Sequence, residues 1–147
     1  MRARSAAALV LSALVVAACG SAAAPTVRLE TAAAPLTSAA AERLAASTDI
    51  SALSAVASTD APALRDDMLA QLRTEGAVGT RAAELLTTGF PKRTASVPVV
   101  VRECTVDGVD AVVVVEAYGD AGKTLTHRRL WVFDRTTGAI LRAASFL

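Results

Sequence analysis

The chain has 147 residues, of which 53% are hydrophobic and 20% charged, and its 15 basic side chains nearly balance 14 acidic ones. This length is enough for one domain with a modest core but not comfortably for two. Because the net charge is close to zero, the composition offers no basic face for nucleic-acid phosphates, and no nucleic-acid partner is predicted.

The N-terminal segment 1–19 has the pattern of an export signal. Arg2 and Arg4 precede an uncharged run over 6–18, and Cys19 follows that run directly. A basic start and a short apolar run are typical of a signal peptide. The alternative is an uncleaved membrane span with Cys19 as an ordinary thiol, but the run is shorter than the about 20 apolar residues that a spanning helix needs.

The residues Val16-Ala17-Ala18-Cys19 resemble the lipobox of bacterial lipoproteins. This resemblance implies that a signal peptide, residues 1–18, is removed and that the thiol of Cys19 takes a diacylglyceryl group. The protein would then be anchored by its lipid to the extracytoplasmic face of the cell membrane. The preference for arginine, with Lys92 and Lys123 as the only lysines, is typical of a GC-rich genome such as that of an actinobacterium.

Residues 19–37 are predicted to form a flexible tether. They are rich in Ala, Ser, Thr and Pro, and their only larger apolar side chains are Val27, Leu29 and Leu36. Such a segment buries too little surface to offset the entropy lost on ordering. A single domain over 38–147 is predicted to follow.

Helical signals occupy residues 38–90. Ser38 is a predicted N-cap, Thr48 and Asp49 open a second helical piece, and Thr59 or Asp60 precedes a third that contains Pro62 in its first turn. In this third helix Leu64, Met68 and Leu72 recur at helical spacing, and the charged residues, Arg65 among them, are predicted to face away. A helix end is predicted at Gly76 and a shorter helix from Thr80 to Gly89.

Valine-rich strands are predicted in residues 96–147. The runs 97–104, 109–118, 125–133 and 139–146 are separated by turn residues, and Asp107-Gly108 is a strong hairpin signal. The sequence therefore predicts an α+β fold in which N-terminal helices pack on a four-stranded antiparallel meander. A helical half before a meander resembles the cystatin-like and nuclear-transport-factor-2-like folds, and 132–141 is similar to the strand-turn-strand of PepSY-type exported domains. These resemblances imply binding of an apolar ligand or a protein partner and no catalytic residue.

One group of side chains on a single sheet face is the candidate ligand site. A loop over 120–123 would set Glu116 opposite His127, a pair that could serve a general base, and would bring the other members to the same face. The candidate residues are Glu116, Tyr118, His127, Arg129 and Trp131. Because no nucleophile accompanies them and charged cross-strand pairs commonly stabilise sheets, a structural role is favoured.

The predicted function is a non-enzymatic binding or adaptor module on the membrane surface. No cofactor is predicted, because no Gly-rich phosphate loop occurs. No metal site is predicted either, because one histidine and Cys104 lack paired spacing. Cys104 is predicted to be buried, since it lies in an apolar run. The alternative function is a small cavity-containing carrier or enzyme that uses Glu116 and His127.

Overall fold

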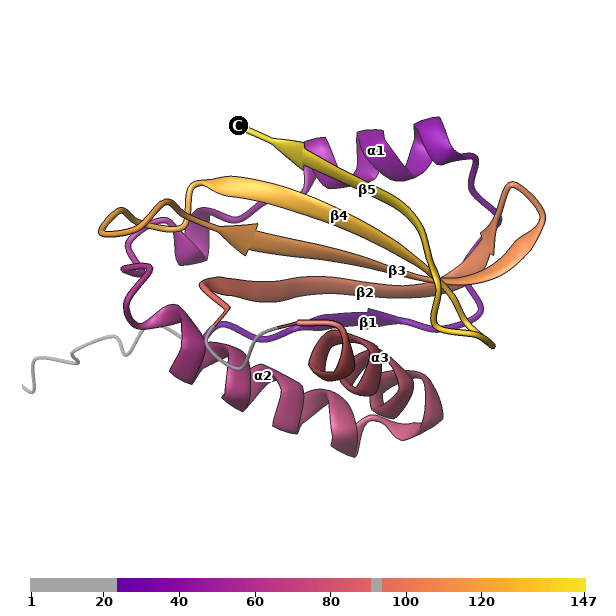
Figure 1. Cartoon of the computed structure of the whole chain (residues 1–147), viewed down its shortest axis with the longest axis horizontal. Helices are drawn as coiled ribbons and strands as arrows, with labels where there is room; N and C mark the ends of the chain where they lie inside the picture. Colours follow the sequence, from indigo (N-terminus) through magenta and orange to yellow (C-terminus); the bar gives the residue numbers. More distant parts are fainter. Residues whose placement is uncertain (1–23, 91–93) are drawn as a thin grey trace, which may run out of the picture.

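A five-stranded mixed sheet with helices on both faces forms the centre of an α+β fold (Figure 1). The computed structural model describes residues 24–90 and 94–147. The predicted signal peptide and Cys19 lie outside these residues. In chain order the elements are β1 (Arg28–Glu30), α1 (Ser38–Ser47), a 3-10 helix (Ser51–Leu53), α2 (Ala61–Thr74), α3 (Gly76–Thr88), β2 (Ser96–Val106), β3 (Val109–Tyr118), β4 (His127–Asp134) and β5 (Ile140–Phe146). The strands lie in this same order across the sheet.

Strand β1 corrects two predictions. Arg28–Glu30 pairs in parallel with β2, Val27 beside it is buried, and Leu36 bridges to Val106. The sheet is therefore mixed and five-stranded, not a four-stranded antiparallel meander. The prediction of a tether up to residue 37 is wrong for this stretch, because its few larger apolar side chains pack on the edge of a sheet supplied by distant residues.

The helices divide between the two faces of the sheet. Helices α2 and α3 pack against each other and on the β2 side of one face, whereas α1 packs over β4 and β5 on the other (Figure 1). Residues 111–117 of β3 are all buried, because this strand is central and covered on both faces. This explains why the sequence of β3 does not indicate which of its two faces is exposed to solvent.

Two apolar cores result, one on each side of the sheet. The core under α2 and α3 includes Leu72, Leu86, Val101 and Val114, and the core under α1 includes Ala41, Ala45, Val113 and Leu130. The β3 side chains alternate between the two cores, because Val112 and Val114 belong to the first core and Val113 and Val115 to the second. None of the helices in the described part of the chain is long and apolar enough to cross a membrane.

The β2–β3 hairpin has the predicted turn and register. Val106 pairs with Val109 and Cys104 with Ala111, which leaves Asp107 and Gly108 as the loop. Both loop residues have positive φ, 49° and 83°, as a type I′ turn requires. The Asp107 carboxylate also accepts from the backbone N–H of Ser38 at 3.2 Å, so the turn helps to cap α1. The N-cap is Thr37 and not Ser38, since the Thr37 hydroxyl accepts from Ala40 N–H.

The β4–β5 connection is held by an aspartate turn. The Asp134 carboxylate accepts from the backbone N–H groups of Thr136 and Thr137 at 2.9 and 2.7 Å. The Thr137 bond in particular lowers the pKa of Asp134. The Asp-x-x-Thr-Gly sequence is thus a structural turn here.

The β3–β4 register differs from the prediction by two residues. Tyr118 lies opposite His127 and Glu116 opposite Arg129. Leu125, predicted as the first strand residue, is instead buried in the connection, where its N–H donates to Val56 carbonyl at 3.0 Å. Thr124 and Leu125 therefore bond to the segment before α2, and the β3–β4 loop is longer than the turn residues indicated.

Candidate ligand-binding face on strand β4

The β4–β5 half of the sheet is only partly covered on the side that carries α2 and α3. These helices pack on β2, and no comparable packing joins them to β4 or β5. Phe90, just after α3, reaches the edge of this area and packs edge-on against Trp131 with ring centroids 4.8 Å apart. Arg129 and Trp131 on β4 remain partly exposed, and Ala143 and Ser145 on β5 are exposed.

Strand alternation places all five predicted site residues on this side of the sheet, and four of them are partly exposed. His127, Arg129 and Trp131 alternate along β4, and Tyr118 from β3 lies opposite His127. The Tyr118 and His127 rings are 5.3 Å apart. Together Tyr118, His127, Arg129 and Trp131 form the Arg129 face.

Arg129 is the centre of this group. Its guanidinium carbon lies 4.3 Å from the Tyr118 ring centroid and 5.7 Å from that of Trp131. Cation–π contacts of this kind hold the flat guanidinium group against the rings and leave its N–H donors to point sideways. Within the described residues no carboxylate forms an ion pair with Arg129. The guanidinium group is therefore oriented but has unused donors on a partly exposed face.

Glu116 lies on the same side of the sheet, opposite Arg129, and does not meet His127. Its side chain is fully buried and forms an ion pair with Arg65 of α2. Its other oxygen accepts from Ser96 hydroxyl at 3.1 Å and from Trp131 Nε1 at 2.9 Å. The predicted Glu116–His127 pair is therefore wrong, because Tyr118 occupies the position opposite the histidine and Glu116 is engaged elsewhere.

Arg65 is the residue that sequence reasoning missed. It was predicted to face solvent, but it is 4% exposed. Besides Glu116, its guanidinium group donates to the backbone carbonyls of Ser96 and Leu86, each at 3.0 Å. A signal was present, since Arg65 follows the buried Ala61 by four positions and precedes the buried Met68 by three, which places it on the buried face of α2.

His127 has little that would activate it as a base. Its Nε2 lies 3.8 Å from a carboxylate oxygen of the exposed Asp120. Its buried Nδ1 has no hydrogen-bond partner among the residues that the structure describes. Among the described residues, no carboxylate is therefore within hydrogen-bond distance of the His127 imidazole.

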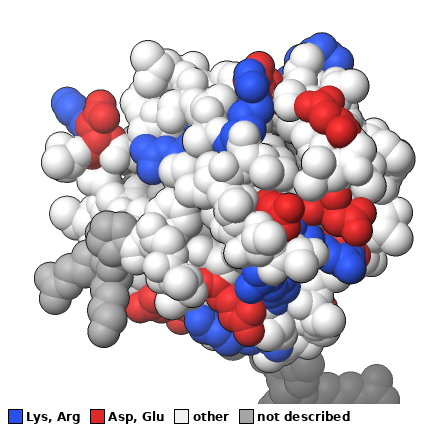
Figure 2. Space-filling model, turned by 45° about the vertical axis from the view of Figure 1, so that its right-hand side comes forward, with Lys and Arg blue, Asp and Glu red and all other residues white. Residues whose placement is uncertain are grey.

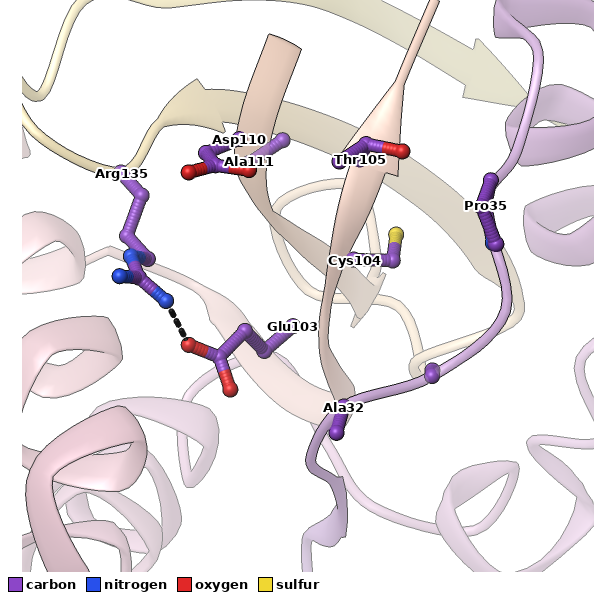
Figure 3. A pocket seen from close by; sticks show the side chains of 9 residues that line it. Ala32, Pro35, Glu103, Cys104, Thr105, Asp110, Ala111 and Arg135 are labelled. Atoms are coloured by element: carbon purple, nitrogen blue, oxygen red, sulfur yellow. Dashed lines mark hydrogen bonds and ion pairs between the residues drawn. The ribbon is translucent and has the colours of Figure 1, made fainter. Parts of the chain in front are cut away.

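A separate cavity of about 300 Å³ opens where the β2–β3 hairpin meets the chain before α1 (Figure 3). Glu103 and Arg135 point toward each other across it and form an ion pair, while Cys104 points to the other side. Cys104 is buried, as predicted, and this burial raises the pKa of its thiol. Because Glu103 and Arg135 neutralise each other, this cavity offers less to a charged ligand than the Arg129 face does.

Surface charge does not point to a different kind of site. On the face that Figure 2 shows, acidic and basic residues lie side by side among uncharged ones, without a broad patch of one sign. Among the residues with described positions, no group of three or more His, Cys, Asp or Glu side chains could hold a metal ion.

Comparison with known proteins adds no relative. No protein-family model, no curated protein and no solved structure matches this chain.

Proposed function

We propose that this protein is a lipid-anchored, extracytoplasmic binding module without catalysis, and that the Arg129 face binds a carboxylate or phosphate group attached to an apolar or aromatic body. The observation that carries this proposal is the guanidinium group of Arg129, held between two aromatic rings without an acidic partner in the described part of the chain. An oriented arginine recognises planar or multidentate anions through paired N–H donors. The adjoining Trp131 ring would contact the apolar part of the ligand.

The buried cluster beside the Arg129 face supports the same role. Glu116 accepts from Trp131 Nε1, which holds the indole in one orientation. Arg65 of α2 neutralises the Glu116 charge, so that this carboxylate competes less for Arg129. A binding surface whose side chains are held in place before the ligand arrives loses less entropy on binding.

The alternative of a cavity enzyme or carrier that uses Glu116 and His127 has less support. Both oxygens of Glu116 are engaged by Arg65, Ser96 and Trp131, and the carboxylate is fully buried. A catalytic acid or base must reach its substrate directly or through one water molecule. An anion-binding face needs no such access to Glu116.

A fluorescence titration tests the Arg129 face. Trp131 is the only tryptophan in the chain, so its emission reports on this face alone. Phenyl phosphate, added to the full chain in detergent, is expected to change the emission saturably. Arg129→Gln is expected to weaken binding by on the order of tenfold, because a charge-assisted hydrogen-bond pair is lost.

Arg73→Gln is the matched control, because Arg73 is exposed on α2 and lies outside the Arg129 face. Its affinity should equal that of the parent chain. Phenol, which has the ring without the anion, should bind much more weakly than phenyl phosphate. Equal binding by the Arg129→Gln and Arg73→Gln variants, or no saturable change with the parent, would contradict the proposed site.

The lipid anchor is tested separately. Cys19→Ser removes the thiol that would carry the lipid, and two or more acyl chains give stable anchoring at a bilayer where a single chain is marginal. We expect the variant to leave the membrane fraction or to accumulate as a precursor that keeps its signal peptide. Cell fractionation and intact mass measure these outcomes, with Cys104→Ala as the control. Membrane retention with an unchanged mass would exclude the lipoprotein assignment.

A further inference from the structure

Strand β5 is an unpaired edge of the sheet. It pairs with β4 on one side, and within the described residues no backbone hydrogen bond reaches its other side. The opposite edge, β1, is only three residues long and carries the charged residues Arg28 and Glu30. The sheet therefore has one long free edge.

The register identifies the backbone groups that point away from β4. In an antiparallel pair, alternate residues direct their N–H and C=O toward the neighbouring strand. The Val106–Val109 pair closes the hairpin, so odd-numbered residues of β3 bond to β2 and even-numbered residues to β4. The bond from Arg135 N–H to Asp110 carbonyl agrees with this. Continuing through β4, even-numbered residues of β5 bond to β4, and residues 141, 143, 145 and 147 direct their backbone groups outward.

The side chains along this edge do little to prevent pairing. Natural sheets commonly protect an edge with lysine, proline or an inward-pointing charge. The segment 140–147 has no lysine or proline, and its one charged side chain, Arg142, is neutralised by Glu42 of α1, with Nε 2.6 Å from the carboxylate. Ile140, Leu141 and Leu147 are 52%, 46% and 92% exposed. Only Leu141, which forms a one-residue irregularity opposite β4, interrupts the strand.

We infer that β5 pairs antiparallel with β5 of a second copy of this chain, about a two-fold axis at Ala144, so that two sheets join into one. In this register residue 143 of one copy lies opposite residue 145 of the other, and 141 lies opposite 147. All four outward-pointing residues of each copy then find backbone partners. Two-fold pairing of this kind uses the same surface on both copies.

The side chains favour a second copy as the occupant because the strand is complementary to itself in this register. The exposed Leu141 of each copy meets the exposed Leu147 of the other, so the two-fold symmetry gives two such contacts. Arg142 lies opposite Phe146, so no like charges face each other, and its ion pair with Glu42 is kept within its own chain. On the face opposite α1, Ala143 meets Ser145, and both are small. The side chains that lie opposite each other across the two β5 strands therefore fit without a clash of charge or bulk.

Charge placed at exposed positions tests the pairing. In Ala143→Glu/Ser145→Glu, each glutamate would face a glutamate of the other copy. In Ala143→Lys/Ser145→Glu, each lysine would face a glutamate. The variants differ at one exposed position and share the glutamate beside Arg129. We expect the parent and the Lys/Glu variant to be dimers by light scattering in detergent, and the Glu/Glu variant to dissociate with a dissociation constant on the order of tenfold higher than that of the Lys/Glu variant.

Disulfide formation tests the register. At the axis, the two copies of residue 144 would have Cα atoms about 4.5 Å apart, within the range for a disulfide, whereas the two copies of residue 143 would be about 8–9 Å apart. Ala144→Cys should form a disulfide-linked dimer on mild oxidation, and Ala143→Cys should not exceed the background that the parent cysteines give. A monomeric parent chain, equal dissociation of the two charge variants, or cross-linking through residue 143 in place of 144 would overturn the inference.

Discussion

Glu116→Gln is expected to lower the free energy of unfolding by about 3–5 kcal/mol, because it leaves the Arg65 charge buried without a counter-charge. The substitution preserves size, so a packing defect does not account for the loss. Arg65 is 4% exposed and Glu116 is fully buried, which keeps water from compensating either charge. Urea-induced unfolding followed by circular dichroism measures the change.

Two further variants separate the effect of the buried charge from the effect of ion pairing in general. Glu84→Gln breaks an exposed pair with Arg81 and should cost about 0–1 kcal/mol. Arg65→Met combined with Glu116→Gln removes both charges and should be more stable than Glu116→Gln alone. Similar losses for Glu116→Gln and Glu84→Gln would show that the buried pair has no special role in stability.

Gly79→Ala is expected to destabilise the protein by about 2–3 kcal/mol, although alanine is the better helix former by about 1 kcal/mol. Gly79 lies where α3 crosses α2. A Cβ atom at this position would be 2.2 Å from the backbone oxygen of Leu72, which cannot rotate away as a side-chain end could. The two helices would have to separate, and the core around Leu72 and Leu86 would loosen.

Gly89→Ala is the control for this substitution, because the added Cβ would meet only Leu85 carbonyl oxygen, at 3.7 Å, an ordinary contact. Its stability should stay within about 0.5 kcal/mol of the parent, as for most substitutions without a specific structural cost. A stability gain in Gly79→Ala under the same urea titration would mean that the α2–α3 crossing tolerates a wider spacing.

Local signals predicted the parts of the fold that depend on neighbours in sequence. Asp107 and Gly108 indicated both a turn and a register, because only a few residues adopt positive φ readily and the strands on either side of the turn must pair directly. The break at Gly76 between two helices is another example. In both places the physical cause lies within a few residues of the effect.

Partners distant in sequence could not be predicted in this way. Strand β1 is too short to form without β2, which lies about seventy positions further along the chain. Leu125 is held by Val56, so the length of the β3–β4 loop depends on a segment that precedes α2. For the site, alternation correctly placed Glu116, Tyr118, His127, Arg129 and Trp131 on one side of the sheet. The partner of Glu116 could not be predicted. Arg65 belongs to α2, and no turn in the sequence determines how this helix packs on the sheet.

Strand β1 limits how far the domain can stand from a bilayer. If Cys19 carries the lipid, as proposed, only eight residue steps separate it from Val27, the first buried residue of the described chain. At about 3.5 Å per fully extended residue, these steps reach no more than about 30 Å. The attachment point lies at the β1 edge of the sheet, and the free β5 edge lies at the other. An anchored domain would thus stay close to the lipid headgroups while its pairing edge lies across the sheet from the anchor, accessible to a neighbour that diffuses in the same leaflet.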